Sequence, residues 1–293
     1  MAKGTNRAAS IKQQLLNLAR AEGRVYDVVL VRYALERLLY RISISEMRDR
    51  FILKGGMLVT LWIEGGNRET RDVDFLGYGD SDERKLRDAF AEIMAIDVDD
   101  GLVFDIEGLR ATAIREEMEY GGVRLRTTAY LERSRIPVTI DIGFGDALAA
   151  SAPSLAYPSL LGMEAPQIRT YPPTAVIAEK FQAMVALGVA NGRMKDYFDL
   201  WAIPRAVELD ETALDAAIQA TFERRQTDIP VGRPPGLSPA LTGDETKQRQ
   251  WRAYAQSIDL ESLTLEEVVE AAWALVGPSC ARIGARGNSS PES

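Results

Sequence analysis

Apolar residues near the start of the chain recur at helical spacing. The first predicted helix begins after Ser10, a residue type that caps helix N-termini. A second predicted helix covers residues 25–41 and has a wide apolar stripe. We assign its arginines Arg32, Arg37 and Arg41 to the solvated side of that helix rather than to a functional basic face.

Beyond the second helix, strand-like and helical patterns alternate. Strands are predicted where apolar residues run together or alternate with polar ones, and helices where they recur every three or four positions. This mixture favours a small, largely central sheet flanked by helices, in an α/β or α+β domain. The predicted strands are 50–54, 72–76, 103–107, 122–130 and 136–142, and the predicted helices are 57–62 and 81–94.

The composition changes near residue 150. Residues 151–173 contain five prolines, which predicts a linker on the surface. We therefore expect a first domain over 1–150 and a helical C-terminal domain over 174–276. Residues 277–293 lack hydrophobic periodicity and are expected to form a disordered tail. The helices of the C-terminal domain are predicted at 174–187, 194–205, 212–225, 243–257 and 263–276.

The composition leaves few kinds of catalytic chemistry. The 293 residues include no histidine and one cysteine, Cys280, which excludes Ser-His and Cys-His nucleophiles, zinc sites and an intramolecular disulfide. Carboxylates, lysines, hydroxyls and oxygen-bound metals such as Mg²⁺ remain. No apolar run reaches the roughly 18 residues that a membrane span needs, and no apolar segment follows the start as in a secretory signal. We expect a cytoplasmic protein.

The net charge of −8 limits nucleic-acid binding to local surfaces. Broad, sequence-independent binding needs a basic surface. A local cluster of Arg124, Arg126, Arg133 and Arg135 lies within twelve residues and could form a basic groove. Charges on strand surfaces are more often only solvated.

Asp72 and Asp74 are the first candidates for a catalytic site. Residues two apart on a strand point to the same face, so both carboxylates project together and repel each other unless a cation lies between them. The apolar residues after Asp74 predict a buried strand whose acidic end lies at a rim. The alternative is two surface aspartates at a turn, because Asp-x-Asp is common by chance.

The glycine pair Gly55-Gly56 gives these aspartates a context. The strand that ends at Lys54 passes through the glycines into a helix, and a helix start after glycines exposes backbone N–H groups to an anion. We expect phosphates at this corner, with the metal ligands Asp72 and Asp74 beside them. Alone, two glycines usually mark only a turn.

Asp141 interrupts a strand that is otherwise apolar on both faces. Burial of an unpaired polar group costs about 2–7 kcal/mol, and burial of a charge costs more. The carboxylate must therefore be paired or metal-bound. Two interpretations stay open: a third metal ligand beside Asp72 and Asp74, or a salt bridge to Arg124 or Arg126 on the neighbouring strand.

Lys180 and Asp196 lie on consecutive predicted helices. Lys180 falls within an apolar run, close to the buried face of its helix, where its ammonium could hold a triphosphate. Asp196 and Asp199 are three positions apart and share one helical face. Taken alone, these residues would be interpreted as a solvated charge run with local ion pairs.

Four separated motifs occur in order between Phe51 and Trp201. They are Phe-Ile-Leu-Lys-Gly-Gly-Met-Leu at 51–58, Arg-Glu-Thr-Arg-Asp-Val-Asp-Phe at 68–75, Glu-Lys at 179–180 and Arg-Met-Lys-Asp-Tyr-Phe-Asp-Leu at 193–200. Together they resemble the motifs of the AbiEii/AbiGii nucleotidyltransferase toxins, a family that also contains the MenT toxins. The resemblance is specific because four motifs agree rather than one.

The resemblance implies an α+β fold, with a nucleotidyltransferase core like that of the DNA polymerase β superfamily, a small mixed sheet and a helical C-terminal region that completes the active site. Members are toxins of toxin–antitoxin or phage-defence pairs, neutralised by an AbiEi-type antitoxin. Some MenT toxins add nucleotides to the tRNA 3′ end. We therefore expect a metal-dependent toxin with NTP, tRNA and an antitoxin as partners. A protein hydroxyl as acceptor, or a nucleotide-binding pseudoenzyme, is the alternative.

The resemblance also implies a triphosphate-binding corner. Gly55 and Gly56 match the motif that cradles the triphosphate. Many members have Ser or Thr next, where this chain has Met57, so Lys54 or the N–H of Gly56 must replace the missing hydroxyl contact. We also expect Arg68 to bind the phosphates.

The remaining motifs imply catalytic residues. Asp72 and Asp74 match the metal pair and are expected to bridge two Mg²⁺ ions. Lys180 matches the conserved lysine of the third motif and is expected to contact the NTP phosphates. Asp196 matches the aspartate of the fourth motif, and Asp199 is its close rival for that role.

Overall fold

A computed structural model describes residues 2–63, 68–114 and 121–287 of the chain. None of the helices in these segments combines the length and the apolarity that a membrane crossing requires. Contacts divide the chain into two units that do not follow the predicted boundary near residue 150. Unit 1 consists of Met1–Leu58, Glu69–Gly145 and Ala152–Thr170, and unit 2 of Val59–Arg68, Asp146–Ser151 and Tyr171–Ser293.

Unit 1 is built on a six-stranded sheet. Its strands are β1 (Phe51–Lys54), β2 (Val73–Gly77), β3 (Leu102–Phe104), β4 (Arg110–Ile114), β5 (Gly122–Leu131) and β6 (Ser134–Phe144). Their order is β1-β2-β6-β5-β3, and β4 also pairs with β5. Because β2 and β6 are parallel and the other pairs are antiparallel, the sheet is mixed. The α+β prediction is confirmed.

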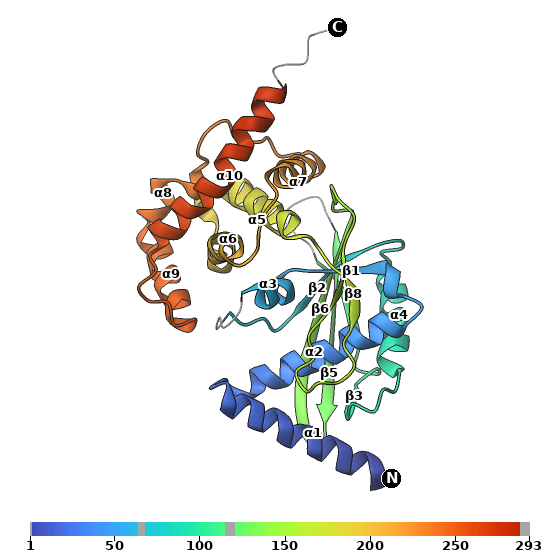
Figure 1. Cartoon of the computed structure of the whole chain (residues 1–293). Coiled ribbons are helices and arrows are strands. Elements are labelled where there is room, and N and C mark those ends of the chain that lie inside the picture. Colours follow the sequence, from blue (N-terminus) through green and yellow to red (C-terminus); the bar gives the residue numbers. More distant parts are fainter. Residues whose placement is uncertain (1, 64–67, 115–120, 288–293) are drawn as a thin grey trace. The chain divides into compact units, whose positions relative to one another are not determined.

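The apolar face of this sheet packs against helices (Figure 1). Alternation along β5 and β6 sends Leu125 and Ile140 to this face, where both are fully buried. The ring of Phe51 in β1 lies 5.0 Å from that of Phe90 on a covering helix. The opposite face therefore receives the polar alternates. The helices of unit 1 are α1 (Ala2–Ala21), α2 (Tyr26–Ile44), η1 (Arg48–Arg50), the start of α3 (Gly56–Trp62) and α4 (Glu83–Ala95).

Two expectations about the first helices are wrong. Ser10 caps no helix, because α1 begins at Ala2 and nothing before Ser10 forces the chain out of the helical conformation. Arg37 and Arg41 are not solvated: each side chain is 2% exposed, and both bind the buried carboxylate of Asp100. Helical periodicity could not reveal a partner so distant in the sequence.

Two segments of unit 1 form strands that the hydrophobic pattern did not predict. In the part of the chain that the structure describes, β4 pairs with β5 alone. It is largely exposed and lacks the apolar alternation that marks a buried strand. Residues 151–173, expected to form a linker, contain the antiparallel pair β7 (Ser154–Ala156) and β8 (Gln167–Arg169). Up to Thr170 this stretch belongs to unit 1.

The long segment of unit 2 is helical. The predicted tail is wrong for residues 277–287, which continue the last helix, and residues 288–293 lie outside the described segments. Ser279 and Cys280 are buried there, and Arg282 donates two hydrogen bonds to Asp215 on a neighbouring helix. These helices are α5 (Pro173–Leu187), α6 (Met194–Ala206), α7 (Glu211–Arg224), α8 (Pro239–Thr242), α9 (Glu245–Ser257) and α10 (Leu265–Gly287), with η2 (Gly188–Ala190) and η3 (Pro235–Leu237).

Candidate functional site

Four charged residues form a row across the polar face of the unit 1 sheet. Lys54 at the end of β1 is the register partner of Asp74 in β2, and Asp74 is the partner of Asp141 in β6. Asp141 in turn faces Arg124 in β5. Residues directly opposite each other project from the same face. The row therefore sets two carboxylates side by side with a cation at each end.

Asp72 lies just before β2, and its negative charge acts on Asp74. The strand begins at Val73, one residue later than predicted. The hydroxyl of Thr70 donates to Oδ1 of Asp72 at 2.7 Å and so fixes its carboxylate. Thr70 was not among the predicted site residues, although a threonine two positions from an aspartate is a known local hydrogen-bonding pattern.

The Asp74 carboxyl lies where negative charge is unfavourable. Burial raises the pKa of Asp74 to about 6, and the charges of Asp72 and Asp141 add to the increase. Lys54 and a hydrogen bond from the N–H of Gly56 act in the opposite direction. A bound cation relieves such an environment. Carboxylate oxygens suit Mg²⁺, which commonly binds one or two of them and completes its shell with water and substrate phosphates.

Asp141 is held by a two-point salt bridge. Arg124 donates from Nε to Oδ1 at 2.6 Å and from Nη2 to Oδ2 at 2.5 Å, while Arg126 takes no part. Of the two interpretations left open for Asp141, the structure contains the salt bridge. Across the described segments, no group of three or more Asp, Glu or Cys side chains is placed to hold a metal ion. The role of Asp141 as a third metal ligand stays a prediction. The other two predicted metal ligands, Asp72 and Asp74, are not engaged by this salt bridge.

The glycine pair Gly55-Gly56 lies against the carboxylate of Asp74. Gly55 has φ of +70°, and a Cβ atom there would lie 1.9 Å from Oδ2 of Asp74. The N–H of Gly56 donates to the same carboxylate. In this structure a carboxylate therefore takes the place that we predicted for a phosphate. Phosphate binding by Lys54, Gly55 and Gly56 stays a prediction.

Replacing Gly55 with alanine is expected to destabilise the protein by about 2–5 kcal/mol. The left-handed conformation costs a non-glycine residue about 1–2 kcal/mol, and the overlap with Asp74 adds about 1–3 kcal/mol. Urea denaturation measures the loss. The control is Gly23→Ala, because Gly23 has φ of +63° but no atom near its absent Cβ. Equal losses in the two variants would contradict the close approach of Asp74.

In unit 2, a buried ion-pair cluster brings Arg68, Lys180 and Asp196 together. The Lys180 ammonium contacts Asp196 and lies 2.9 Å from Oδ2 of Asp199. Arg68 donates to both oxygens of Asp199, at 2.6 and 2.8 Å, and Nε of Arg193 lies 2.6 Å from Oδ2 of Asp196. Among the described residues of this cluster there are three cations and two carboxylates. The alternative of a solvated charge run is wrong, because the side chains of Lys180, Asp196 and Asp199 are 11%, 4% and 0% exposed.

The cluster favours the charged forms of Lys180 and Asp196. Burial acts to lower the pKa of Lys180, but the attraction of Asp196 and Asp199 outweighs it, and the pKa is raised. Burial likewise opposes the charge of Asp196, yet Lys180 and Arg193 lower its pKa. Arg68 occupies both oxygens of Asp199, whereas Oδ2 of Asp196 accepts no well-aligned hydrogen bond from any described residue. The role of Asp196 in the fourth motif stays a prediction, which this difference supports.

Two crystal structures from Helicobacter pylori are similar to this chain over most of their length. JHP933 shares 13% identity, covers 87% of this chain and 93% of its own, and has a TM-score of 0.42. A second protein, provisionally named a nucleotidyltransferase, shares 12% identity, covers 86% of this chain and 95% of its own, and has a TM-score of 0.43. No curated protein sequence matches the chain.

The sequence profile of the nucleotidyl transferase AbiEii toxins, of type IV toxin–antitoxin systems, matches residues 37–274. The matched span contains every predicted site residue, from Lys54 to Asp199, and most of both units. It confirms the resemblance that the four motifs indicated. The chain therefore belongs to the AbiEii family of nucleotidyl transferase toxins.

Proposed function

We propose that the chain transfers a nucleotide from an NTP to the 3′ end of tRNA, with Asp72 and Asp74 at the centre of the reaction, and so blocks translation. Membership of the family supports nucleotidyl transfer from an NTP and implies an antitoxin partner. The single observation that carries the catalytic assignment is the half-buried Asp74 carboxyl beside Asp72, with its raised pKa. In this proposal the enzyme acts in the cytoplasm, where NTPs and tRNA meet, and an AbiEi-type antitoxin restrains it.

The chain's own residues prepare a cation site before substrate arrives. Thr70 orients Asp72, the N–H of Gly56 orients Asp74, and Lys54 limits the repulsion between the two carboxylates. Asp72 and Asp74 would hold Mg²⁺, as one or two ions. When bound there, Mg²⁺ neutralises phosphate charge and activates the attacking hydroxyl.

The unit 2 cluster supports a role in binding the triphosphate. Arg193 is 60% exposed at the edge of this cluster, where its guanidinium is accessible to an anion. The two carboxylate contacts of Lys180 make its ammonium a fixed charge, already oriented rather than free to move. We propose that Lys180, Arg68 and Arg193 stabilise phosphate charge, with Asp196 assisting at the acceptor.

The experiment supplies each α-phosphate-labelled NTP, Mg²⁺ and total tRNA. We expect labelled tRNA from the wild type, and none from Asp72→Asn or Asp74→Asn, because each change removes half of the charge that holds the cation. Asp49→Asn is the control, since this aspartate is 78% exposed in the same unit. Label on protein instead of tRNA would favour the hydroxyl-acceptor alternative. Nucleotide binding without any label would favour a pseudoenzyme, and full labelling by either site variant would end the assignment.

A further inference from the structure

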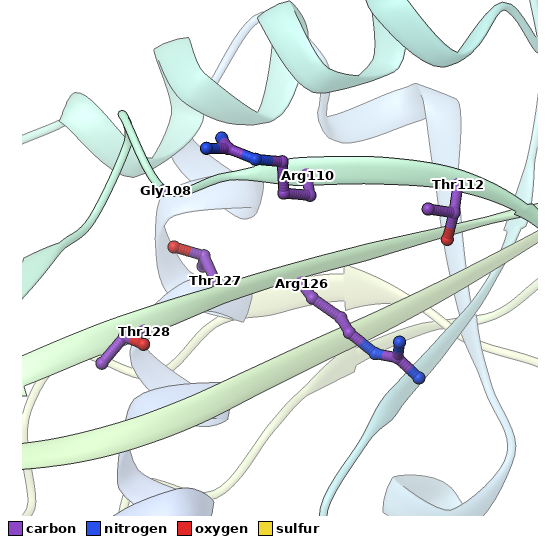
Figure 2. A pocket seen from close by; sticks show the side chains of 6 residues that line it. All are labelled: Gly108, Arg110, Thr112, Arg126, Thr127 and Thr128. Atoms are coloured by element: carbon purple, nitrogen blue, oxygen red, sulfur yellow. The ribbon is translucent and has the colours of Figure 1, made fainter.

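A pocket on the unit 1 sheet adjoins the charged row. It has a volume of about 380 Å³ and lies where β4 pairs with β5 (Figure 2). The sheet register pairs Arg110 with Arg126 and Thr112 with Arg124. Thr112 therefore continues the row Lys54–Asp74–Asp141–Arg124 by one more strand. The pocket is lined by Gly108, Arg110, Thr112, Arg126, Thr127 and Thr128.

Within residues 2–63, 68–114 and 121–287, no carboxylate bonds either arginine of this pocket. Arg126 is exposed and has no hydrogen bond or ion pair to any residue of the described segments. Among the residues that the structure describes, Arg110 donates to two backbone carbonyls, at 2.7 and 3.1 Å, and to no side chain. Asp105 lies beside the pocket, and its Oδ1 accepts the N–H of Gly108, but no lining residue is acidic. In a chain of net charge −8, this local positive charge indicates an anion site.

The arrangement of the side chains suits an extended anion rather than a single ion. In Figure 2 the guanidinium of Arg110 turns toward Gly108, whereas the guanidinium of Arg126 and the hydroxyl of Thr112 point together away from it. The two guanidinium groups therefore point apart instead of converging on one point. A chain of phosphates can contact them in succession.

The pocket lies within reach of the catalytic carboxylates. Arg126 is two residues from Arg124 along β5, and Arg124 is separated from Asp74 by one strand, β6. With about 4.8 Å between strands and about 3.3 Å per residue, the Cα atoms of Arg126 and Asp74 are roughly 12 Å apart. A strand of nucleic acid whose end reacts at Asp72 and Asp74 would pass over this pocket within a few nucleotides.

We propose that this pocket binds backbone phosphates of the acceptor nucleic acid next to its reacting 3′ end, through Arg126 and Arg110 and the hydroxyls of Thr112 and Thr128. The inference rests on the proposed function and specifies a nucleic-acid acceptor rather than a protein hydroxyl. Guanidinium groups match phosphate oxygens in geometry as well as charge. Contacts to phosphates position a strand without reading its sequence, so a small basic area is enough on an acidic protein.

Arg126→Gln is expected to weaken binding of a fluorescein-labelled single-stranded oligoribonucleotide about tenfold, because one charged hydrogen bond is lost. The slope of log K against log salt should fall by about 0.7, the value for one phosphate contact on a single strand. Arg133→Gln is the control: it removes the same charge at the exposed turn of the same β5–β6 hairpin. An unchanged dissociation constant for Arg126→Gln, or equal weakening by both variants, overturns the proposal.

A second measurement assigns the pocket to acceptor or to NTP. The thermal shift that NTP and Mg²⁺ produce should be the same in Arg126→Gln and wild type. A smaller shift with unchanged RNA binding would assign the pocket to NTP and overturn the proposal. Asp74→Asn should lose transfer and keep RNA binding. Absence of transfer in the wild type, with RNA binding that still depends on Arg126, would end the catalytic assignment and leave the pocket supported.

Discussion

Replacing Asp74 with asparagine is expected to raise the free energy of unfolding of the metal-free protein by about 3 kcal/mol at neutral pH, while it removes nucleotide transfer. The pKa of this carboxyl is raised from an ordinary 3.8 to about 6, and each pKa unit corresponds to about 1.4 kcal/mol. Asparagine keeps the size of the side chain and an oxygen that accepts the N–H of Gly56. It loses the negative charge that burial and Asp72 disfavour.

The pH dependence of this difference has a definite sign. Because the pKa of Asp74 in the folded protein lies above its unfolded value, the folded state gains from protonation below about pH 4. That contribution is lost as the pH rises through about 6. The gap between Asp74→Asn and wild type should therefore be small near pH 4 and reach its full size above about pH 7.

Urea denaturation in the presence of EDTA, repeated across this pH range, measures the gap. Asp88→Asn is the matched control, because Asp88 is 62% exposed and its loss should give no such pH dependence. Added Mg²⁺ should narrow the gap by stabilising only the wild type. A variant less stable than wild type at neutral pH without metal would show that Lys54 overcompensates the charge, and the cation-site assignment would lose its physical basis.

The sequence predicts the parts of this site that depend on local pattern. Alternation along β5 and β6 places Arg124 and Asp141 on neighbouring strands of one sheet, so their salt bridge is one of the two interpretations that the sequence allows for Asp141. The Gly-Gly step between strand and helix is also predictable. The close approach of Gly55 to Asp74 is not predictable from the local sequence, because it depends on the pairing of β1 with β2.

Features that depend on a distant partner could not be predicted from the hydrophobic pattern. Strand β4 is polar and exposed, and only its pairing with β5 makes it a strand. The end of α10 lacks apolar periodicity, yet Arg282 anchors it to Asp215. Asp196 and Asp199 resembled part of a solvated charge run because their buried cationic partner, Lys180, lies on the preceding helix. In each case a polar contact holds the segment in place. The spacing of apolar residues along the chain does not record such a contact.

Replacing Asp100 with asparagine is expected to lower the free energy of unfolding by about 3–5 kcal/mol, because it leaves two buried arginines without their common carboxylate. Asp100 is 1% exposed; Nη2 of Arg41 donates to it at 3.0 Å, and Nε of Arg37 at 3.3 Å. Asparagine can still accept the N–H of Leu102, which bonds Oδ1 at 3.0 Å. The loss therefore reports the missing charge rather than a missing hydrogen bond of the backbone.

Urea denaturation at neutral pH compares this variant with Asp88→Asn, which breaks the exposed Arg87–Asp88 pair and should change stability by no more than about 0.5 kcal/mol. Replacing Asp100, Arg37 and Arg41 together by Leu, Met and Met should recover most of the loss, since apolar residues of similar size can substitute for a buried ion cluster. If instead Asp100→Asn loses no more than the control, the other carboxylate near this cluster already compensates both arginines. That carboxylate is Glu36, 3.5 Å from Arg37, and α2 would then be held to the sheet without Asp100.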